Sequence, residues 1–225
     1  MWVIDNSADV LEKIDYYNDN TNARNVWTYD FSTLYTNIPH TDLKKKMKWV
    51  VEKAIDSEKR QKIYVDKYNS TASWSERKNA YIVSKNTLIK YINFLVDNIF
   101  IKVGDHIFRQ NIGIPMGTDC APFLANLYLY ALEFDYLEET TKKNIFLARK
   151  FTNSFRYIDD LLSFNNFKLI DKCKHKIYPK ELVLNCENGS QDLCTFLDIH
   201  MHVVDSIIHT KLYDKRDEYT CQTHT

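Results

Sequence analysis

The sequence predicts an α+β fold in which a small, mostly antiparallel sheet is backed by helices. Residues 26–31 alternate and are rich in β-prone side chains, as expected of a strand. Residues 155–164 form an apolar and aromatic run that contains the adjacent pair Asp159-Asp160, which predicts a hairpin with the two aspartates at its tip. Apolar residues recur at helical spacing in residues 86–98 and 123–134, which predicts two of the helices.

The remaining elements are assigned from shorter signals. Pro39 precedes a helix in which Asp42 lies near the start, where the helix dipole favours a carboxylate. Gly104-Asp105 separates two β-prone segments and predicts a hairpin. A last helix is expected at residues 167–177, and short strands are expected at residues 182–187, 194–204 and 206–212.

Two segments are assigned no core element. Residues 1–25 are polar and acidic and are interpreted as a lead-in to the fold. Residues 52–79 are highly charged, which predicts an exposed helix end followed by a variable loop.

The aspartates at strand ends are the candidates for chemistry. Two adjacent carboxylates in an apolar run are costly to bury unless something binds them, and Mg2+ prefers carboxylate oxygens together with substrate phosphates. Asp30, near the end of the first predicted strand, supplies a third carboxylate that can converge on Asp159 and Asp160. Such a set can hold two metals about 3.5–4 Å apart for an in-line phosphoryl displacement. The competing interpretation is a solvated Asp-Asp turn and an ordinary Asp cap.

A glycine-rich loop is the third informative segment. Residues 110–122 hold two of the chain's four glycines and two of its four prolines, and they lead into the apolar helix. Pro122 fits the first turn of that helix. Glycines just before a helix let backbone amides approach a phosphate or a base pair closely, although an ordinary loop–helix junction would look the same.

Taken together and in this order, the three segments resemble motifs A, B and C of a reverse transcriptase palm. Among reverse transcriptases the likeness is to those of Penelope-like retroelements, a class of transposable element, and it runs from residue 27 to residue 213. The resemblance implies a right-hand polymerase palm with RNA-directed DNA polymerase activity. The matching residues are Leu34-Tyr35-Thr36-Asn37-Ile38-Pro39, Gly113-Ile114-Pro115-Met116-Gly117, Leu124-Ala125-Asn126-Leu127-Tyr128 with Glu133, Arg156-Tyr157-Ile158-Asp159-Asp160, and Phe196-Leu197-Asp198.

The resemblance also implies metal ligands and catalytic residues. Asp30 and Asp159 would be the main ligands of two Mg2+ ions, which Mn2+ could replace, and Asp160 would support them. The carbonyl oxygen of Phe31 could complete one metal shell. The implied partners are an RNA template, a DNA primer and deoxynucleoside triphosphates.

Further roles concern the nucleotide and the primer. The resemblance implies that the amides of Thr33 and Leu34 face the triphosphate. It also implies that Tyr35 packs under the sugar and excludes a 2′-hydroxyl, the group that distinguishes RNA from DNA; plain core packing is the alternative for Tyr35. Met116 and Gly117 would lie beneath the template base and the incoming nucleotide. The primer would be gripped by Phe196, Leu197 and Asp198.

By the same resemblance, residues 1–25 are a remnant of the fingers lead-in, residues 26–213 the palm, and residues 214–225 the truncated start of a thumb. The chain departs from the family pattern in its small share of fingers and thumb. It also lacks a lysine in residues 188–192, where some polymerases place one that protonates pyrophosphate.

Composition sets limits on these interpretations. The chain has 225 residues, 44% of them hydrophobic, which is enough for one domain with a core, and its formal net charge of zero is unusual for a polymerase. The five cysteines form no C-x-x-C pair, so no structural zinc site is expected. His200-Met201-His202 places two imidazoles on one face of a strand and is interpreted as a polar strand face.

Location follows from what the sequence lacks. There is no recognisable signal peptide and no apolar run of about 18 residues, so the sequence predicts an intracellular protein with no membrane partner. Membership of an active retroelement would imply the nucleus.

Four functions remain open from the sequence. The first is an active reverse transcriptase palm of Penelope-like type, favoured by Asp30, Asp159 and Asp160. The second is a catalytically inactive retroelement remnant that at most binds nucleic acid, favoured by the short ends. The others are a telomerase-like or intron-type polymerase, and a non-enzymatic globular protein with chance motifs.

Overall fold

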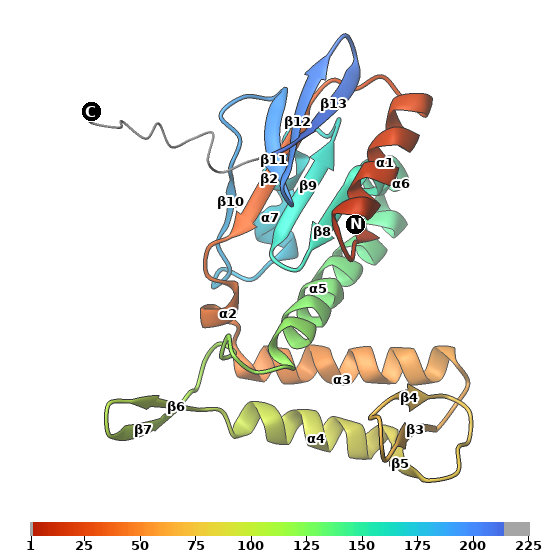
Figure 1. The fold of residues 1–225 in the computed structure, drawn as a ribbon, viewed down its shortest axis with the longest axis vertical. Helices are drawn as coiled ribbons and strands as arrows, with labels where there is room; N and C mark the ends of the chain where they lie inside the picture. Colours follow the sequence, from red (N-terminus) through yellow and green to blue (C-terminus); the bar gives the residue numbers. More distant parts are fainter. Residues whose placement is uncertain (1, 214–225) are drawn as a thin grey trace, which may run out of the picture. The chain divides into compact units, whose positions relative to one another are not determined.

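The computed structural model describes residues 2–213, which divide into two compact units. The first unit combines residues 2–32 with residues 136–213, and the second unit consists of residues 33–135. Helix α5 (Ala121–Lys143) begins in the second unit and ends in the first (Figure 1). The predicted thumb start, residues 214–225, lies outside the described residues.

The main sheet of the first unit carries the aspartates. Within residues 2–213 it has five strands in the order β1-β8-β9-β2-β10, and all neighbours are antiparallel except β1 and β8. The predicted hairpin is confirmed as β8 and β9, but its two-residue turn is Ile158-Asp159 and not the Asp pair, because Asp160 already pairs with Tyr157 as the first residue of β9. The strands are β1 (Trp2–Val3), β2 (Val26–Phe31), β8 (Ser154–Tyr157), β9 (Asp160–Phe164) and β10 (Leu184–Cys186).

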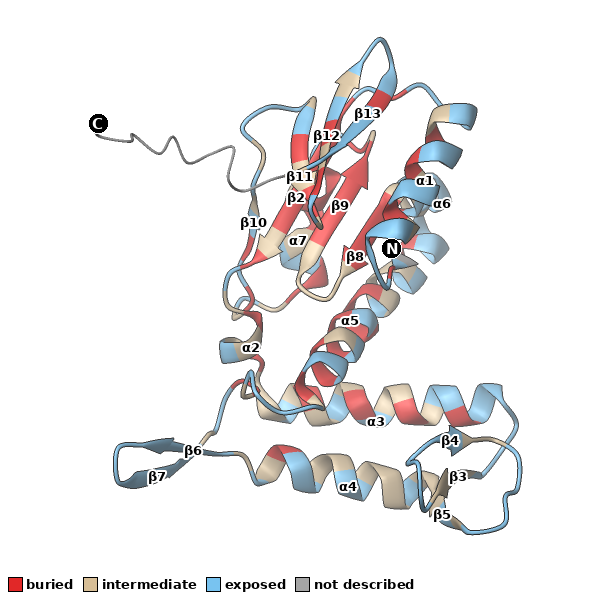
Figure 2. Cartoon of the chain, viewed as in Figure 1, coloured by how far each residue is buried: buried red, intermediate tan, exposed pale blue. Residues whose placement is uncertain are grey.

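One face of the main sheet is covered by helix α1 (Ser7–Asn20) and by a small sheet of strands β11 (Leu193–Phe196), β12 (Ile199–Val204) and β13 (Ile207–Leu212). Buried side chains from these elements and from the main sheet form one hydrophobic core. Figure 2 shows buried residues, in red, along the strands of the main sheet. Its members include Val10, Ile14, Val26, Leu162, Phe164, Phe196, Met201 and Ile208.

Helix α1 corrects the interpretation of residues 1–25 as a polar lead-in. Asn6 caps the helix by accepting hydrogen bonds from the backbone amides of Ala8 and Asp9. Val10, Ile14 and Tyr17 follow at intervals of four and three residues and are buried. Only one narrow stripe of this helix is apolar, so the polar majority of the segment concealed it.

The small sheet corrects the expectation of a continuous strand at residues 194–204. Leu197 and Asp198 both adopt left-handed backbone conformations, with φ of 46° and 62°. Positive φ at both central residues is what a two-residue type I′ turn requires, and the chain reverses there between β11 and β12. Neither residue is glycine, so no turn was predicted at this point.

The other face of the main sheet is covered by helices. Phe31 alternates with Asp30 along β2 and therefore points to the opposite face, where its ring meets Tyr178 edge-on at 4.8 Å. Tyr178 directly follows α7 (Leu169–Ile177), the helix predicted at residues 167–177. The short elements α6 (Ile145–Arg149) and η1 (Lys150–Asn153) lead from α5 into β8.

The second unit is built on two helices that lie side by side, α3 (His40–Ser57) and α4 (Lys85–Asp97) (Figure 1). Both were predicted, as was the hairpin of β6 (Phe100–Val103) and β7 (His106–Arg109). The variable loop expected at residues 52–79 is wrong in part, because β3 (Lys62–Asp66) pairs with β4 (Ala72–Ser73) and with β5 (Ala80–Ser84). These strands are short and flanked by charged residues, which hid their alternation.

No helix in residues 2–213 is long and apolar enough to cross a lipid bilayer.

Candidate active site

The register of the main sheet brings the predicted carboxylates together. Asp30 on β2 lies directly opposite Asp160 on β9. Side chains of directly opposite residues share a face of the sheet, with their Cβ atoms about 5 Å apart. Asp159 occupies the turn between β8 and β9, next to Asp160. Asp30, Asp159 and Asp160 therefore gather at one end of the sheet, from segments far apart in the chain.

The turn that presents Asp159 has a strained backbone. Tyr157 and Asp160 are paired, so the turn consists of Ile158 and Asp159 alone. Ile158 has φ of 50°, a left-handed conformation that a β-branched residue adopts at a cost of about 1–3 kcal/mol. Strain of this kind persists only where the surrounding contacts hold it.

Arg156 supplies one such contact. Its side chain is completely buried, with 0% exposure, and its Nη1 donates a hydrogen bond of 2.9 Å to the carbonyl oxygen of Ile158. The arginine thus holds the peptide group that precedes Asp159. The sequence interpretation gave Arg156 no role, although a charged residue inside an apolar run was a signal that it is buried with partners.

Crowding of like charges perturbs the carboxylates. Burial and the nearby charge of Asp159 raise the pKa of Asp30 above its ordinary value. Burial, followed by the charges of Asp159, Asp30 and Glu187, raises the pKa of Asp160 to about 6. The ionised site therefore carries unfavourable repulsion that a bound cation would relieve.

Glu187 is a fourth carboxylate at this site that the sequence interpretation missed. It directly follows β10, and its backbone amide donates to the Thr28 carbonyl oxygen at 3.0 Å. Burial and the charge of Asp30 raise its pKa. No local pattern could have found it, because its position depends on the pairing of β10 with β2.

The donor set fits a hard divalent cation by its chemistry. Mg2+ is commonly held by one or two carboxylates, with substrate phosphates and water completing the shell. As the side chains lie, no three Asp, Glu, His or Cys residues within residues 2–213 form a group that could hold a metal ion by themselves. The two-Mg2+ assignment stays a prediction.

The Asp160→Asn variant tests how much the charge of Asp160 destabilises the folded chain. A pKa raised in the folded state means that the unfolded state ionises first, so the contribution of Asp160 to stability is lost as the pH rises from about 4 to about 6. At pH 7 the variant should be more stable than the parent by about 1 kcal/mol, a figure reduced for solvent screening. At pH 4 the two should be equal. Urea unfolding at both pH values measures this, and a pH-independent difference would contradict it.

The nucleotide-binding residues expected from the resemblance lie in the second unit. Leu34 and Tyr35 belong to the short helix α2 (Leu34–Asn37), where Leu34 is buried and Tyr35 half-buried. Thr33 caps this helix, and its buried hydroxyl has no hydrogen-bond partner among the described residues. Met116 is 71% exposed, and the space around Gly117 is open.

The glycine-rich loop is bonded to the segment around α2. The amide of Gly113 donates to the Ile38 carbonyl oxygen at 2.8 Å, and the amide of Ile114 donates to the Tyr35 carbonyl oxygen at 2.6 Å. The Nε2 atom of His40 lies 2.6 Å from the Gly113 carbonyl oxygen. The structure therefore brings Tyr35 and the loop together within the second unit, and their binding of a nucleotide stays a prediction.

The residues expected to grip the primer form the turn between β11 and β12 in the first unit. Phe196 is buried in the core, Leu197 packs against it, and Asp198 is exposed. Tyr157 of the hairpin packs against the same core. The predicted primer grip and the aspartate hairpin thus rest on one set of buried side chains.

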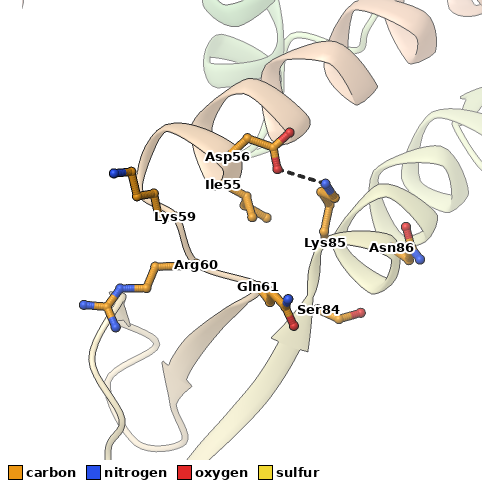
Figure 3. Close-up of a pocket in the computed structure, with 8 residues that line it drawn as sticks. All are labelled: Ile55, Asp56, Lys59, Arg60, Gln61, Ser84, Lys85 and Asn86. Atoms are coloured by element: carbon orange, nitrogen blue, oxygen red, sulfur yellow. Dashed lines mark hydrogen bonds and ion pairs between the residues drawn. The ribbon is translucent and has the colours of Figure 1, made fainter.

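A cavity of about 500 Å³ in the second unit lies between the end of α3 and the start of α4. Lys85 crosses it to pair with Asp56 at 3.0 Å, whereas the side chains of Lys59 and Arg60 extend away from the other lining residues (Figure 3). Because these positively charged side chains do not converge on one point, the cavity is not a candidate anion-binding site.

Comparisons with known proteins identify the fold only. No protein-family profile matches the chain, and no curated protein matches it. Among solved structures, telomerase from Candida albicans in complex with the TWJ fragment of telomeric RNA matches 94% of this chain with a TM-score of 0.63 at 16% identity. Apo telomerase from Candida tropicalis matches 93% with a TM-score of 0.60 at 16% identity.

A Candida tropicalis telomerase truncated from its C-terminal domain matches 93% of this chain with a TM-score of 0.56 at 15% identity. The matched regions make up 36%, 36% and 41% of the three telomerase chains, so this chain spans little more than a third of their length. Over nearly all of its own length, the chain is therefore similar in fold to a part of telomerase.

Proposed function

We propose that this chain is the palm of a reverse transcriptase of Penelope-like type, which adds deoxynucleotides to a primer 3′-hydroxyl on an RNA template. The observation that carries the proposal is the pairing of Asp30 with Asp160, with Asp159 in the adjoining turn. Its likeness in fold to telomerase, itself a reverse transcriptase, supports the same chemistry. The sequence motifs favour the retroelement type over telomerase.

In this proposal the chain's residues bind cations and exclude nucleotides that carry a 2′-hydroxyl. Asp30 and Asp159 would hold the cations, and Asp160 and Glu187 would add negative potential that raises cation affinity. Two Mg2+ ions, when bound, supply activation of the primer hydroxyl and neutralisation of the triphosphate. Tyr35 limits the space at the sugar, and Phe196, Leu197 and Asp198 hold the primer end.

The test is primer extension on an RNA template with deoxynucleoside triphosphates and Mg2+. Extension by the parent chain, lost in Asp159→Asn, is the expected result, because the amide oxygen is neutral and lacks the charge with which a carboxylate binds Mg2+. Asp205→Asn is the matched control, since Asp205 lies in the exposed turn between β12 and β13. Extension that survives in Asp159→Asn would refute the mechanism.

The second candidate is a catalytically inactive remnant that binds nucleic acid. The telomerase match with RNA bound favours nucleic-acid binding. No extension by any variant, with fluorescence anisotropy showing binding to an RNA–DNA hybrid, would support this candidate instead.

A further inference from the structure

The outer face of the small sheet gathers histidines from two strands. His200 and His202 alternate with the buried residue Met201 along β12, so both imidazoles point away from the core. In the register of β12 and β13, His202 lies directly opposite His209. From the sequence, His200 and His202 were interpreted as a polar strand face. His209 joins them only through the pairing of β12 with β13.

The spacing suits a shared metal ion. Directly opposite residues place their Cβ atoms about 5 Å apart, and residues two apart on a strand lie about 6.6 Å apart. Zinc–nitrogen bonds are about 2.0–2.1 Å long, so imidazoles at these separations can reach one ion by rotation about their side-chain bonds. His202 and His209 are exposed, and exposed side chains change rotamer on the picosecond to nanosecond scale.

A hydrogen bond already orients one of these rings, and a carboxylate lies near a second. The Nδ1 atom of His200 lies 3.1 Å from the Thr195 hydroxyl oxygen, which leaves Nε2 as the nitrogen that can bind a metal. Histidine ligands in metal sites usually make this kind of second hydrogen bond. The Nε2 atom of His202 lies 3.8 Å from a carboxylate oxygen of Asp192, whose side chain is about half exposed and can serve as a fourth ligand.

We propose that His200, His202 and His209, together with Asp192, form a binding site for Zn2+ or a similar borderline divalent ion. In the described residues these side chains do not yet converge on one point. Binding of the ion therefore requires His202 and His209 to rotate toward each other. The ion would clamp β12 to β13 and, through Asp192, to the segment that leads into β11. Imidazole nitrogens select such ions, whereas Mg2+ prefers the oxygen ligands of the carboxylate site.

The test is calorimetric titration of the full chain with Zn2+ in a buffer free of chelators, with thermal unfolding as a second readout. Saturable binding and a raised Tm are expected. His209→Ala should weaken binding by about 100-fold or more, because the chelating pair is lost. Thr195→Val should weaken it by about 10-fold, because the ring of His200 loses its orienting partner. His175→Ala removes an exposed histidine on α7 and should change nothing.

Two outcomes would overturn the proposal. The first is the absence of saturable binding up to the millimolar range. The second is Zn2+ binding that is equal in the parent and in His209→Ala, which would assign the ion to thiols such as Cys120 and Cys186. Circular dichroism checks that each variant is folded, and His209→Gln serves as a second variant that preserves polarity on the sheet surface. None of these readouts depends on polymerase activity.

Discussion

The Gly113→Ala variant is expected to lose about 3 kcal/mol or more of the folding free energy of the second unit. Gly113 has a backbone φ of 80°, a conformation that residues other than glycine rarely adopt. A Cβ atom built there would lie 2.5 Å from the carbonyl oxygen of Tyr35 and 2.6 Å from that of Thr36. Both obstacles are backbone atoms, so no side chain can move aside to relieve the clash.

The same contacts explain why the loop cannot simply withdraw. Retreat of Gly113 would break the hydrogen bonds that the loop makes to the Ile38 and Tyr35 carbonyl oxygens. It would also break the isolated bridge between Pro39 and Ile112. Each lost bond in a buried setting costs about 1 kcal/mol on average. The substitution therefore loosens the whole connection between α2 and the glycine-rich loop.

Gly117→Ala is the matched control for this prediction. No atom lies within 4 Å of the position that its Cβ would take, so the fold should tolerate the methyl group. Hydrogen exchange of the second unit, read alongside urea unfolding, measures both variants without assuming that the two units unfold together. Equal loss of protection in the two variants would contradict the prediction. A Gly117→Ala chain that folds normally but extends primers poorly would support the contact of Gly117 with the nucleotide.

Local sequence patterns predicted the elements better than their pairing. The alternation of residues 26–31 and the apolar run around Asp159 were sufficient to predict β2 and the β8–β9 hairpin. Glu187 joins Asp30 only because β10 pairs with β2, and His209 meets His202 only through the β12–β13 register. The β10–β2 register depends on packing between segments far apart in the chain, for which a single sequence holds no local signal. The β12–β13 register follows from the two-residue turn Asp205-Ser206, which has positive φ at both residues but no glycine or asparagine to mark it.

One turn was missed and another was placed one residue too late, because the residues that usually mark such turns are absent. The turn at Leu197 and Asp198 has two positive φ angles without the glycine or asparagine that normally marks such a turn. Ile158 likewise occupies a left-handed position where a glycine would be expected. Both positions adjoin residues assigned to the proposed chemistry, Asp198 and Asp159, which fits the tendency of strained backbone to concentrate at functional sites.

The Arg156→Met variant is expected to lose about 2–3 kcal/mol of folding free energy and to lose primer extension with it. Methionine fills much of the same volume, but it cannot donate to the carbonyl oxygen of Ile158, which Arg156 does at 2.9 Å. That carbonyl belongs to the peptide group before Asp159, in a turn that Ile158 enters at a conformational cost. Without the buried guanidinium, the turn can relax to a less strained path and move the Asp159 carboxylate away from Asp30.

Arg156→Lys separates the charge of this side chain from its geometry. Lysine keeps the positive charge but lacks the planar, forked donors of arginine, so we expect partial loss of stability and a large loss of extension. Urea unfolding gives the stability of each variant, and extension assayed over a range of Mg2+ concentrations reports whether Asp159 is still correctly placed. If both variants fold as stably as the parent and extend primers at the parent's Mg2+ requirement, Arg156 does not position the turn. If both variants need more Mg2+ than the parent, and Arg156→Met needs more than Arg156→Lys, the buried arginine is the residue that holds Asp159 in place beside Asp160.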